Sequence, residues 1–490
     1  MRKLVIILAL VLSGIAANAQ NGRPKLVVGI IIDQMRWEYL QYYYDEYCEG
    51  GFKRLMSEGY SCDNHMINYL PTITAVGHAS TYTGTTPAIH GIAGNNFFLN
   101  GKEVYCCTDA SVEPVGTKNE AGRMSPCNLL STTIGDQIRL FSDFNSKVIG
   151  VALKDRAAIL PAGRSANAAY WYDVKAGRFV TSTYYMKELP KWVDKFNKSN
   201  KIKPGVDPKS IPDGTTLTFD MAEAAVKNEG LGKGEYTDMI CVSISSTDAM
   251  AHTYGTKGEE HNAVYMATDK GLEHFLSFLD QEVGKGEYLV FLTADHGGCH
   301  NPNYMNEHKL AGGGWDEGKV VKNINADLVK KYGKEGKYIN AYMDSRIYLN
   351  HGWLEENAID VDGVKAFVIK QLRKEKDLAW VVDLENAATA NVPAIVKERI
   401  INGYNWHRSG DIMILPQPAT FTWAFDNNYR GATHFNWNTY DAHIPLLFMG
   451  WNVKHGRTSA PTRLVDTAAT ICDILRIQQP NGCIGNPIIF

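Results

Sequence analysis

Residues 25–33 read KLVVGIIID, a run of apolar and β-branched residues that ends in a carboxylate. A continuous apolar run of this kind is typical of a strand that is buried on both faces of a parallel sheet. Three further runs have the same character, at 147–153, 237–248 and 288–295. Helical patterns separate these runs, and the alternation predicts an α/β fold with a doubly wound, mostly parallel sheet flanked by helices.

Two later runs, at 411–416 and 444–450, have the same composition and are expected in the same sheet. Between the strands, apolar residues recur with the spacing of helices that pack one face on a core. The helices predicted in this way cover residues 52–58, 133–141, 217–226, 261–283 and 465–475.

The first residues of the chain have the pattern of a secretory signal peptide. A basic start is followed by a short apolar run and by the small residues Ala17-Asn18-Ala19. The apolar run is well short of the roughly 20 residues that a membrane-spanning helix needs. We therefore expect cleavage after Ala19 and a periplasmic or secreted bacterial protein.

Residues 20–490 are expected to form a single catalytic domain with two insertions, near 157–212 and 300–408. The first insertion contains an aromatic hairpin at 170–185, interpreted as a lid, and the second is interpreted as a cap. The formal net charge is −3 and no basic stripe is present, which argues against a nucleic-acid polymer as partner. No other segment is apolar enough to span a membrane, and the sequence leaves the oligomeric state open.

Four polar residues end or directly follow the predicted strands: Asp33, Lys154, Asp248 and Asp295. The carboxyl ends of parallel strands meet at one edge of the sheet, where ligands bind in open α/β folds. A single aspartate at such a position is commonly a helix or turn cap. Four polar residues at one edge point instead to a functional site.

Two histidines accompany these aspartates. His252 follows Asp248 by four residues, so one helical turn would bring both side chains to the same face as a pair of metal ligands. His296 is adjacent to Asp295 and precedes two glycines that allow a tight turn. Ionisable residues at the end of a buried strand are costly unless they are paired or coordinated. The pattern predicts most of a two-metal centre.

A metal centre of this kind needs a nucleophile, and the candidate is Thr74 in PTITAVGHAS, residues 71–80. The segment after Pro71 has the small residues of a helix start. A threonine at a helix N-terminus is near free amides and the positive end of the helix dipole, which favour an alkoxide or a phosphate. The alternative is an ordinary N-cap threonine.

Taken together, these segments resemble the alkaline phosphatase superfamily, and most closely its PafA-type bacterial alkaline phosphatases, which are related to type I phosphodiesterase/nucleotide pyrophosphatases. The matching segments follow one another in the order of the family and cover nearly the whole mature chain. They are IDQMRW at 32–37, PTITAVGH at 71–78, HGIAGN at 90–95, LKDRAAILPAG at 153–163, SSTDAMAH at 245–252, TADHG at 293–297 and GATHFNWNTYDAHIPLLFMG at 431–450.

The resemblance implies two zinc ions and their ligands. One zinc would be held by Asp33, Asp295, His296 and Thr74, and the other by Asp248, His252 and a late histidine. Two histidines compete for the last position. We favour His434, which lies in a Gly-containing loop well before the last strand, over His443, which abuts that strand.

The resemblance also assigns phosphate binding to Asn95, Lys154 and Arg156. A monoester presents three non-bridging oxygens, which an arginine fork, an amide and an ammonium group would bind. Lys154 and Arg156 would share one strand face. Diesterases of the superfamily lack this Lys and Arg pair, so the expected activity is hydrolysis of phosphate monoesters through a phosphothreonine at Thr74, with release of inorganic phosphate.

Two other functions remain as alternatives. A phosphodiesterase or nucleotide pyrophosphatase could use the same scaffold, and a secreted binding protein could retain the fold without catalysis. The stretch at 185–213 is shorter than in longer family members, which affects the expected contacts to the leaving group.

Overall fold

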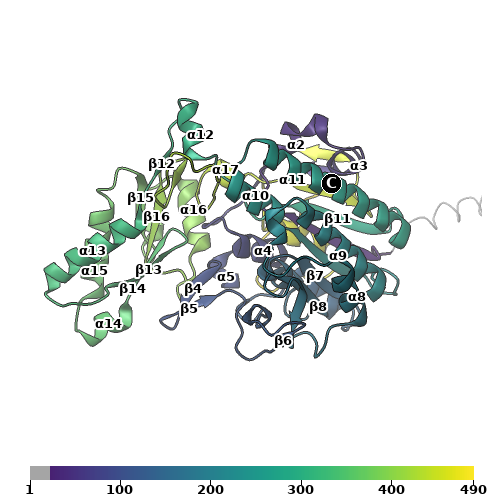
Figure 1. The fold of residues 1–490 in the computed structure, drawn as a ribbon, viewed down its shortest axis with the longest axis horizontal. Helices are drawn as coiled ribbons and strands as arrows, with labels where there is room; N and C mark the ends of the chain where they lie inside the picture. Colours follow the sequence, from purple (N-terminus) through teal and green to yellow (C-terminus); the bar gives the residue numbers. More distant parts are fainter. Residues whose placement is uncertain (1–21) are drawn as a thin grey trace, which may run out of the picture.

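The computed structural model describes residues 22–490, so the predicted signal peptide lies outside the described residues. A ten-stranded sheet forms the centre of the molecule (Figure 1). In spatial order its strands are β19 (Gly456–Thr458), β2 (Tyr60–Cys62), β18 (Leu446–Gly450), β11 (Tyr288–Thr293), β1 (Leu26–Ile32), β10 (Asp238–Ile244), β7 (Val148–Ala152), β8 (Ala168–Asp173), β9 (Arg178–Ser182) and β6 (Pro114–Val115).

Five neighbouring strands, β11-β1-β10-β7-β8, run parallel and make up the core of the sheet. Strand β1 lies between β10 and β11, with Leu26 opposite both Asp238 and Tyr288. All seven residues of β1 are buried, and they alternate between two separate apolar clusters on the two faces of the sheet. This burial on both faces explains the continuous apolar run and confirms the predicted doubly wound fold.

Helices cover both faces. Helices α2, α3, α9 and α11 pack on one face, and α4, α6 and α18 pack on the other. The helices of the main body are α2 (Tyr39–Tyr42), α3 (Phe52–Glu58), α4 (Thr74–Thr83), α5 (Pro87–His90), α6 (Ile134–Phe141), α7 (Asp155–Ala162), α8 (Lys191–Ser199), α9 (Asp213–Glu229), α10 (Ser246–Tyr254), α11 (Glu259–Leu279), α17 (Thr439–Ala442) and α18 (Asp466–Leu475). In the described part of the chain, no helix is both long and apolar enough to cross a bilayer.

The strand predicted at 444–450 belongs to the main sheet, as β18, but its direction is opposite to that of the core strands. It pairs antiparallel with β11, with Phe448 opposite Phe291. Its residues are apolar because they are buried, and burial alone does not determine the direction of a strand. On the other side of β18, strands β2 and β19 pair parallel with each other.

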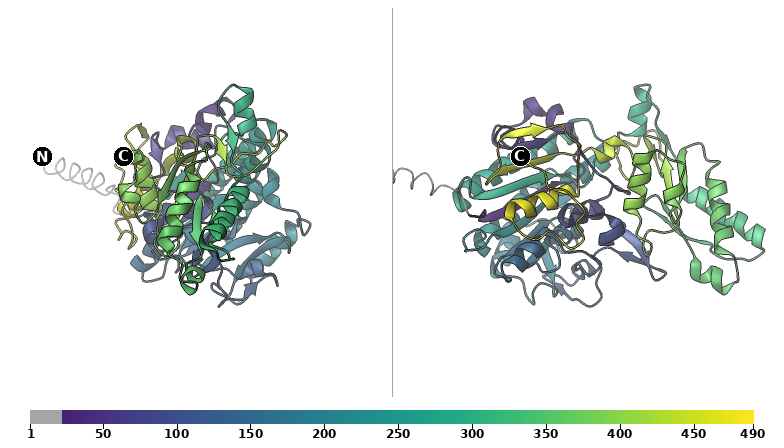
Figure 2. Two further views of the ribbon diagram at one scale, coloured as in Figure 1. Left: turned by 90° about the vertical axis from the view of Figure 1, so that its left-hand side faces the viewer. Right: turned by 180° about the vertical axis from the view of Figure 1, so that it is seen from behind.

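The strand predicted at 411–416 lies outside the main sheet, which corrects the expectation. It is β16 (Ile412–Pro416), in a second sheet of order β13-β14-β16-β15 in which all pairs are antiparallel. Figures 1 and 2 show this sheet in a lobe to one side of the main body. The elements of this region are α12 (Pro302–Glu307), β12 (Gly313–Gly314), α13 (Glu317–Tyr332), β13 (Ile339–Met343), β14 (Arg346–Leu349), α14 (His351–Glu356), α15 (Val361–Leu372), β15 (Leu378–Asp383), α16 (Ala394–Gly403) and β17 (Thr420–Phe421).

The lobe has its own apolar core, in which Leu328 of α13, Val368 of α15 and Ile414 of β16 are fully buried. Most of it lies within the predicted insertion at 300–408. The division of the chain into one catalytic domain with two insertions stays a prediction. The remaining short strands are β3 (His65–Met66), β4 (Asn96–Leu99), β5 (Lys102–Tyr105) and β20 (Thr462–Arg463).

The aromatic hairpin expected at 170–185 forms from β8 and β9, which pair antiparallel between Trp171 and Val180. It is part of the main sheet, because β8 also pairs with β7. Trp171 and Tyr170 are buried in it. The hairpin therefore extends the sheet, and its interpretation as a lid stays a prediction.

Helix α4 lies very close to the end of β11, and Gly77 makes this approach possible. A Cβ atom at Gly77 would lie 2.3 Å from the carbonyl oxygen and 2.5 Å from the Cβ of Asp295. Both distances are shorter than real Cβ contacts, and backbone atoms cannot easily give way. Glycine at this position therefore sets the distance between α4 and the residues that follow β11.

We expect Gly77→Ala to destabilise the protein by about 1–3 kcal/mol, the usual cost of overpacking a core. The measurement is the free energy of unfolding in urea. Gly318→Ala is the matched control, because it is also a helical glycine and its Cβ would have only Asp316 Oδ1 nearby, at 3.7 Å. Equal stability of the Gly77→Ala and Gly318→Ala variants would contradict the close packing of α4.

Candidate active site and metal centre

The topology brings the predicted ligands to one edge of the sheet. Strand β1 lies between β10 and β11, so Asp33 after β1 is flanked by Asp295 after β11 and by Asp248 after β10. Asp248 is in the first turn of α10 and not at the end of a strand, and His252 follows in the same helix. One helix turn joins this pair, as the four-residue spacing predicts.

Asp33, Asp295 and His296 form one candidate metal site. All three are fully buried, and one ligand atom from each lies within 4.8 Å of the other two. His296 Nε2 is 3.5 Å from Asp33 Oδ1 and 3.6 Å from Asp295 Oδ2. None of these three atoms has a hydrogen-bond partner among residues 22–490. Buried polar atoms are rarely left unpaired, so this donor set fits a divalent cation such as zinc.

Asp248, His252 and His434 come together beside this first group. Asp248 Oδ1 is 3.1 Å from His252 Nε2 and 3.8 Å from His434 Nε2. The Nδ1 atom of each imidazole donates to a backbone carbonyl, His252 to Ala432 at 2.8 Å and His434 to Thr72 at 2.7 Å. These bonds set the tautomer and turn Nε2 toward the carboxylate, as in histidines that bind metals. The two groups adjoin, since His296 also lies within 4.8 Å of Asp248 and His434.

His443, the competing candidate, lies away from both groups. Its Nε2 bonds to the carbonyl oxygen of Asp63 at 2.8 Å, and its ring stacks on Trp37. Both interactions are structural. Of the two late histidines, His434 is the one that lies beside the carboxylates.

Thr74 is buried at the N-terminus of α4, and it is the first helical residue. The N-cap position is occupied by Ile73, so the alternative of an N-cap threonine is wrong. Thr74 Oγ1 is 3.5 Å from Lys154 Nζ, the ammonium group that also contacts the carboxylates. The hydroxyl is therefore close to the ligand groups and at the positive end of a helix.

Lys154 connects the two groups of ligands. Its ammonium donates to Asp33 Oδ2 at 2.5 Å and to Asp248 Oδ2 at 2.7 Å. Lys154 is the N-cap residue of α7, two residues after β7, and Arg156 is in the first turn of that helix, so the two side chains do not share a strand face. Three buried carboxylates and one ammonium leave a surplus of negative charge, which further favours a cation here.

The electrostatic environment shifts the pKa values of the three carboxylates in different directions. Burial, together with Asp248 and Asp295, raises the pKa of Asp33 well above its usual range. Burial also opposes the ionisation of Asp248, but His252 and Lys154 outweigh it and hold the pKa of this carboxyl well below its usual range. The pKa of Asp295 is likewise lowered despite burial, by His296 and by neighbouring groups.

Asn95 and Arg156 are held by different contacts. Asn95 Oδ1 accepts from the backbone amide of Ala75, the residue after Thr74, at 3.1 Å. Arg156 donates to the hydroxyl of Tyr105 at 3.1 Å, and that hydroxyl donates to Asp155 at 2.5 Å. Arg156 Nε has no hydrogen-bond partner in the part of the chain that the structure describes. Donor groups of Arg156 are thus available for an anion.

Two polar residues at the centre were not identified from the sequence. Gln34 donates through its side-chain amide to Asp248 at 2.7 Å and through its backbone amide to Asp295 at 3.2 Å, which links the two groups of ligands. His78, in the segment at 71–78, has Nδ1 3.3 Å from Asp295 Oδ2. Each residue lies in one of the segments that carry the family resemblance. Its position in the sequence does not indicate a contact with Asp248 or Asp295, which are far away in the chain.

Asp344 links the smaller lobe to Asn95 and had no signal in the sequence. It lies in the turn between β13 and β14, and a Cβ atom at Gly94 would be 2.4 Å from its Oδ2. Burial raises the pKa of Asp344 to about 6, although Arg346 and the backbone amide of Asn95 oppose the shift. The lobe thus contacts the segment that holds Asn95.

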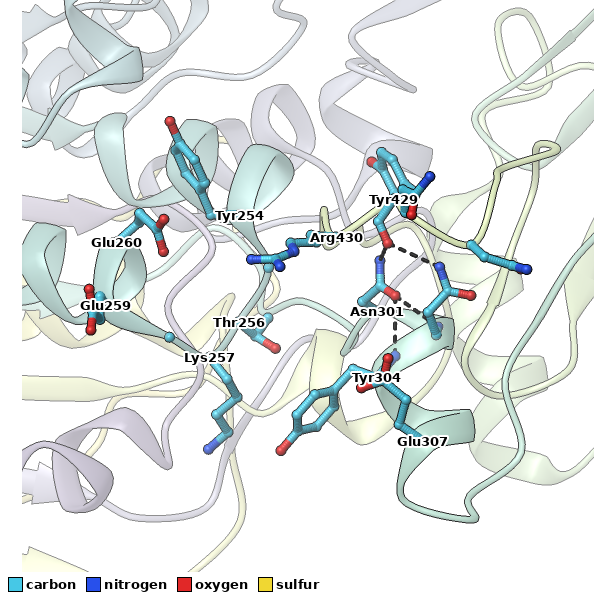
Figure 3. A pocket seen from close by; sticks show the side chains of 15 residues that line it. Tyr254, Thr256, Lys257, Glu259, Glu260, Asn301, Tyr304, Glu307, Tyr429 and Arg430 are labelled. Atoms are coloured by element: carbon cyan, nitrogen blue, oxygen red, sulfur yellow. Dashed lines mark hydrogen bonds between the residues drawn. The ribbon is translucent and has the colours of Figure 1, made fainter.

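Two cavities lie near the centre. One of about 740 Å³, shown in Figure 3, has Tyr254, Lys257, Tyr304 and Arg430 in its lining and includes none of the predicted site residues. The second, of about 580 Å³, includes Lys154 and Arg156 in its lining. The second cavity is therefore the one next to the predicted chemistry, although the first is larger.

Comparisons with known proteins show what this chain is similar to. The family model for type I phosphodiesterase / nucleotide pyrophosphatase matches residues 27–441. A protein of Elizabethkingia meningoseptica named alkaline phosphatase PafA is 41% identical, over 98% of this chain and 97% of that protein. A protein of Myroides odoratus named calcium-transporting ATPase is 44% identical, over 97% and 96%. The crystal structure of wild-type PafA has a TM-score of 0.91 at 40% identity and covers 95% of this chain and 98% of its own.

The two late histidines give a direct test of the metal ligands. We expect His434→Ala to lower the zinc content from about two ions per chain to about one, because the second group then keeps only Asp248 and His252. His443→Ala is the matched control and should keep both ions. The measurement is elemental analysis of the purified proteins after dialysis. Loss of zinc from the His443→Ala protein, with full zinc in the His434→Ala protein, would reverse the assignment.

Proposed function

The chain belongs to the type I phosphodiesterase / nucleotide pyrophosphatase family of the alkaline phosphatase superfamily, and on that premise we propose that it hydrolyses phosphate monoesters at a two-zinc centre, with Thr74 as nucleophile. It is an alkaline phosphatase by its near full-length similarity to PafA. The observation that supports the finer proposal is that two adjoining ligand groups share contacts with Lys154, whose ammonium is 3.5 Å from the Thr74 hydroxyl at the N-terminus of α4.

The proposed ligands divide between two zinc ions. Asp33, Asp295 and His296 would hold one ion, with Thr74 as a further ligand. Asp248, His252 and His434 would hold the other. Zinc, when bound, supplies positive charge that lowers the pKa of a nearby hydroxyl and stabilises the attacking and leaving oxygens.

Thr74 forms the covalent intermediate in this proposal. Its hydroxyl loses a proton, and the oxygen attacks phosphorus in line with the leaving alkoxide. The bond to the leaving oxygen breaks and a phosphothreonine remains. Water then attacks this intermediate from the side that the leaving group occupied, releases inorganic phosphate and restores the threonine.

Three side chains would balance the charge on the phosphoryl oxygens. Arg156 offers a planar fork of donors, and Lys154 adds a compact positive charge beside Thr74. Asn95, which is tied to the first turn of α4, would donate from its amide nitrogen, since its Oδ1 already accepts from Ala75. Together they suit a dianionic monoester better than a diester, which has one fewer charge and a second substituent.

The proposal includes the setting of the reaction. Substrates are small phosphate esters, without a nucleic-acid polymer as partner. The location is periplasmic or secreted, and rests on the predicted signal peptide at residues 1–19, with cleavage after Ala19.

Thr74→Ala should bring turnover of p-nitrophenyl phosphate down to background while the zinc content stays close to that of the wild type, because the other ligands remain. Thr74→Ser keeps the hydroxyl and is the matched control, with measurable turnover. Activity and metal content are measured on the same preparations. A Thr74→Ala protein with wild-type turnover would sink the nucleophile assignment.

The nearest alternative is a phosphodiesterase or nucleotide pyrophosphatase, which the name of the matching family favours. We expect kcat/KM to be higher for p-nitrophenyl phosphate than for bis-p-nitrophenyl phosphate. Arg156→Ala should lower kcat/KM for the monoester by roughly 10- to 100-fold, the range for a lost hydrogen bond to a charged group, and lower that for the diester less. A wild-type preference for the diester would overturn the choice of monoesters.

A further inference from the structure

The cavity of about 580 Å³ beside Lys154 and Arg156 extends beyond the residues proposed to bind the phosphoryl group. It lies at the carboxyl ends of the parallel strands β7 and β8, and its rim includes Lys118, Lys175 and Lys209. Its volume is in the range of small-molecule sites. The atoms of a substrate beyond its reacting phosphoryl group have room here.

The carboxylates of this cavity already have partners within the protein. Asp173 accepts from the side chains of Thr117 at 2.6 Å and Asn119 at 2.7 Å, and its other oxygen accepts from two backbone amides. Glu120 forms an ion pair with Arg123 at 3.2 Å. The third carboxylate, Asp155, accepts from Tyr105 at 2.5 Å. These carboxylates keep their charge, but five cationic side chains line the cavity against three carboxylates, which leaves a surplus of positive charge.

Two of the rim lysines have no such partner. Lys209 is bound to Asp207 at 2.8 Å. Lys118 and Lys175 are exposed, and neither forms an ion pair with any residue of the range 22–490. A simple monoester has one phosphoryl group, which Lys154 and Arg156 would bind. The ammonium groups of Lys118 and Lys175 are thus left for a second anion.

Polar groups in the wall of the cavity also lack partners. Tyr172 is 6% exposed, and its hydroxyl has no hydrogen-bond partner within the described residues. Arg156 Nε is also buried without a hydrogen-bond partner within the described residues. Buried donors of this kind are normally satisfied, so the wall has hydrogen-bonding capacity that the protein itself does not use.

We propose that this cavity is a subsite for a second phosphate group, carried by the leaving group of the substrate, so that the enzyme favours small bisphosphorylated molecules over the matched monophosphates. The inference rests on the proposed function, because it takes Lys154 and Arg156 as the binding site of the reacting phosphoryl group. Lys118 and Lys175 attract the second phosphate at the rim. Their exposure makes the attraction sensitive to salt.

The test compares fructose 1,6-bisphosphate with fructose 6-phosphate in the wild type and in the double variant Lys118→Ala/Lys175→Ala. We expect the ratio of the two kcat/KM values to fall by about fivefold in the variant, the combined effect of two exposed charge pairs. Turnover of p-nitrophenyl phosphate, which has no second phosphate, should stay within about twofold of the wild type. In the wild type, added sodium chloride should lower the ratio as well.

Lys319→Ala/Lys322→Ala is the matched control, since both lysines are exposed on α13 in the smaller lobe and the net charge changes equally. It should leave the ratio unchanged. If the wild type hydrolyses p-nitrophenyl phosphate but the ratio is the same in the rim variant, the subsite is refuted and the proposed function stands. If the wild type hydrolyses none of these esters, the proposed function itself fails.

Discussion

The burial of three carboxylates at one edge of the sheet is the constraint on which the rest of the centre depends. Asp33, Asp248 and Asp295 are withdrawn from water, and Lys154 is the ammonium group that contacts two of them. Charges in such a position are tolerated only when opposite charges and hydrogen bonds compensate them. The histidines, the lysine and the proposed zinc ions compensate the negative charge of these carboxylates. The positive charge gathered in this way can also lower the pKa of the Thr74 hydroxyl.

Adjacent strands of the central sheet bring these carboxylates together. Strands β11, β1 and β10 are adjacent and parallel, so the residues after them converge without long loops. Helix α4 supplies Thr74, and the contact of Gly77 with Asp295 sets how closely this helix approaches the residues after β11. Backbone carbonyls orient His252 and His434. A centre held in this way is organised before the substrate arrives, which is what electrostatic catalysis needs.

Much of this could be read from the sequence, and the exceptions have physical reasons. Apolar runs that end in charged residues indicated the core strands and the strand-end ligands, because burial on both faces leaves a continuous pattern. The same pattern placed β16 in the main sheet and gave no sign that β18 runs antiparallel, since burial specifies neither the pairing partner nor the direction of a strand. Gln34 and Asp344 were not found, because their contacts join residues far apart in the chain.

The central claim is that these buried side chains bind two metal ions next to Thr74. Anomalous diffraction from crystals of the zinc-replete protein, recorded on both sides of the zinc edge, tests it most directly. The account predicts two peaks, one bounded by Asp33, Asp295 and His296 and the other by Asp248, His252 and His434. A single peak, or peaks away from these side chains, would contradict it.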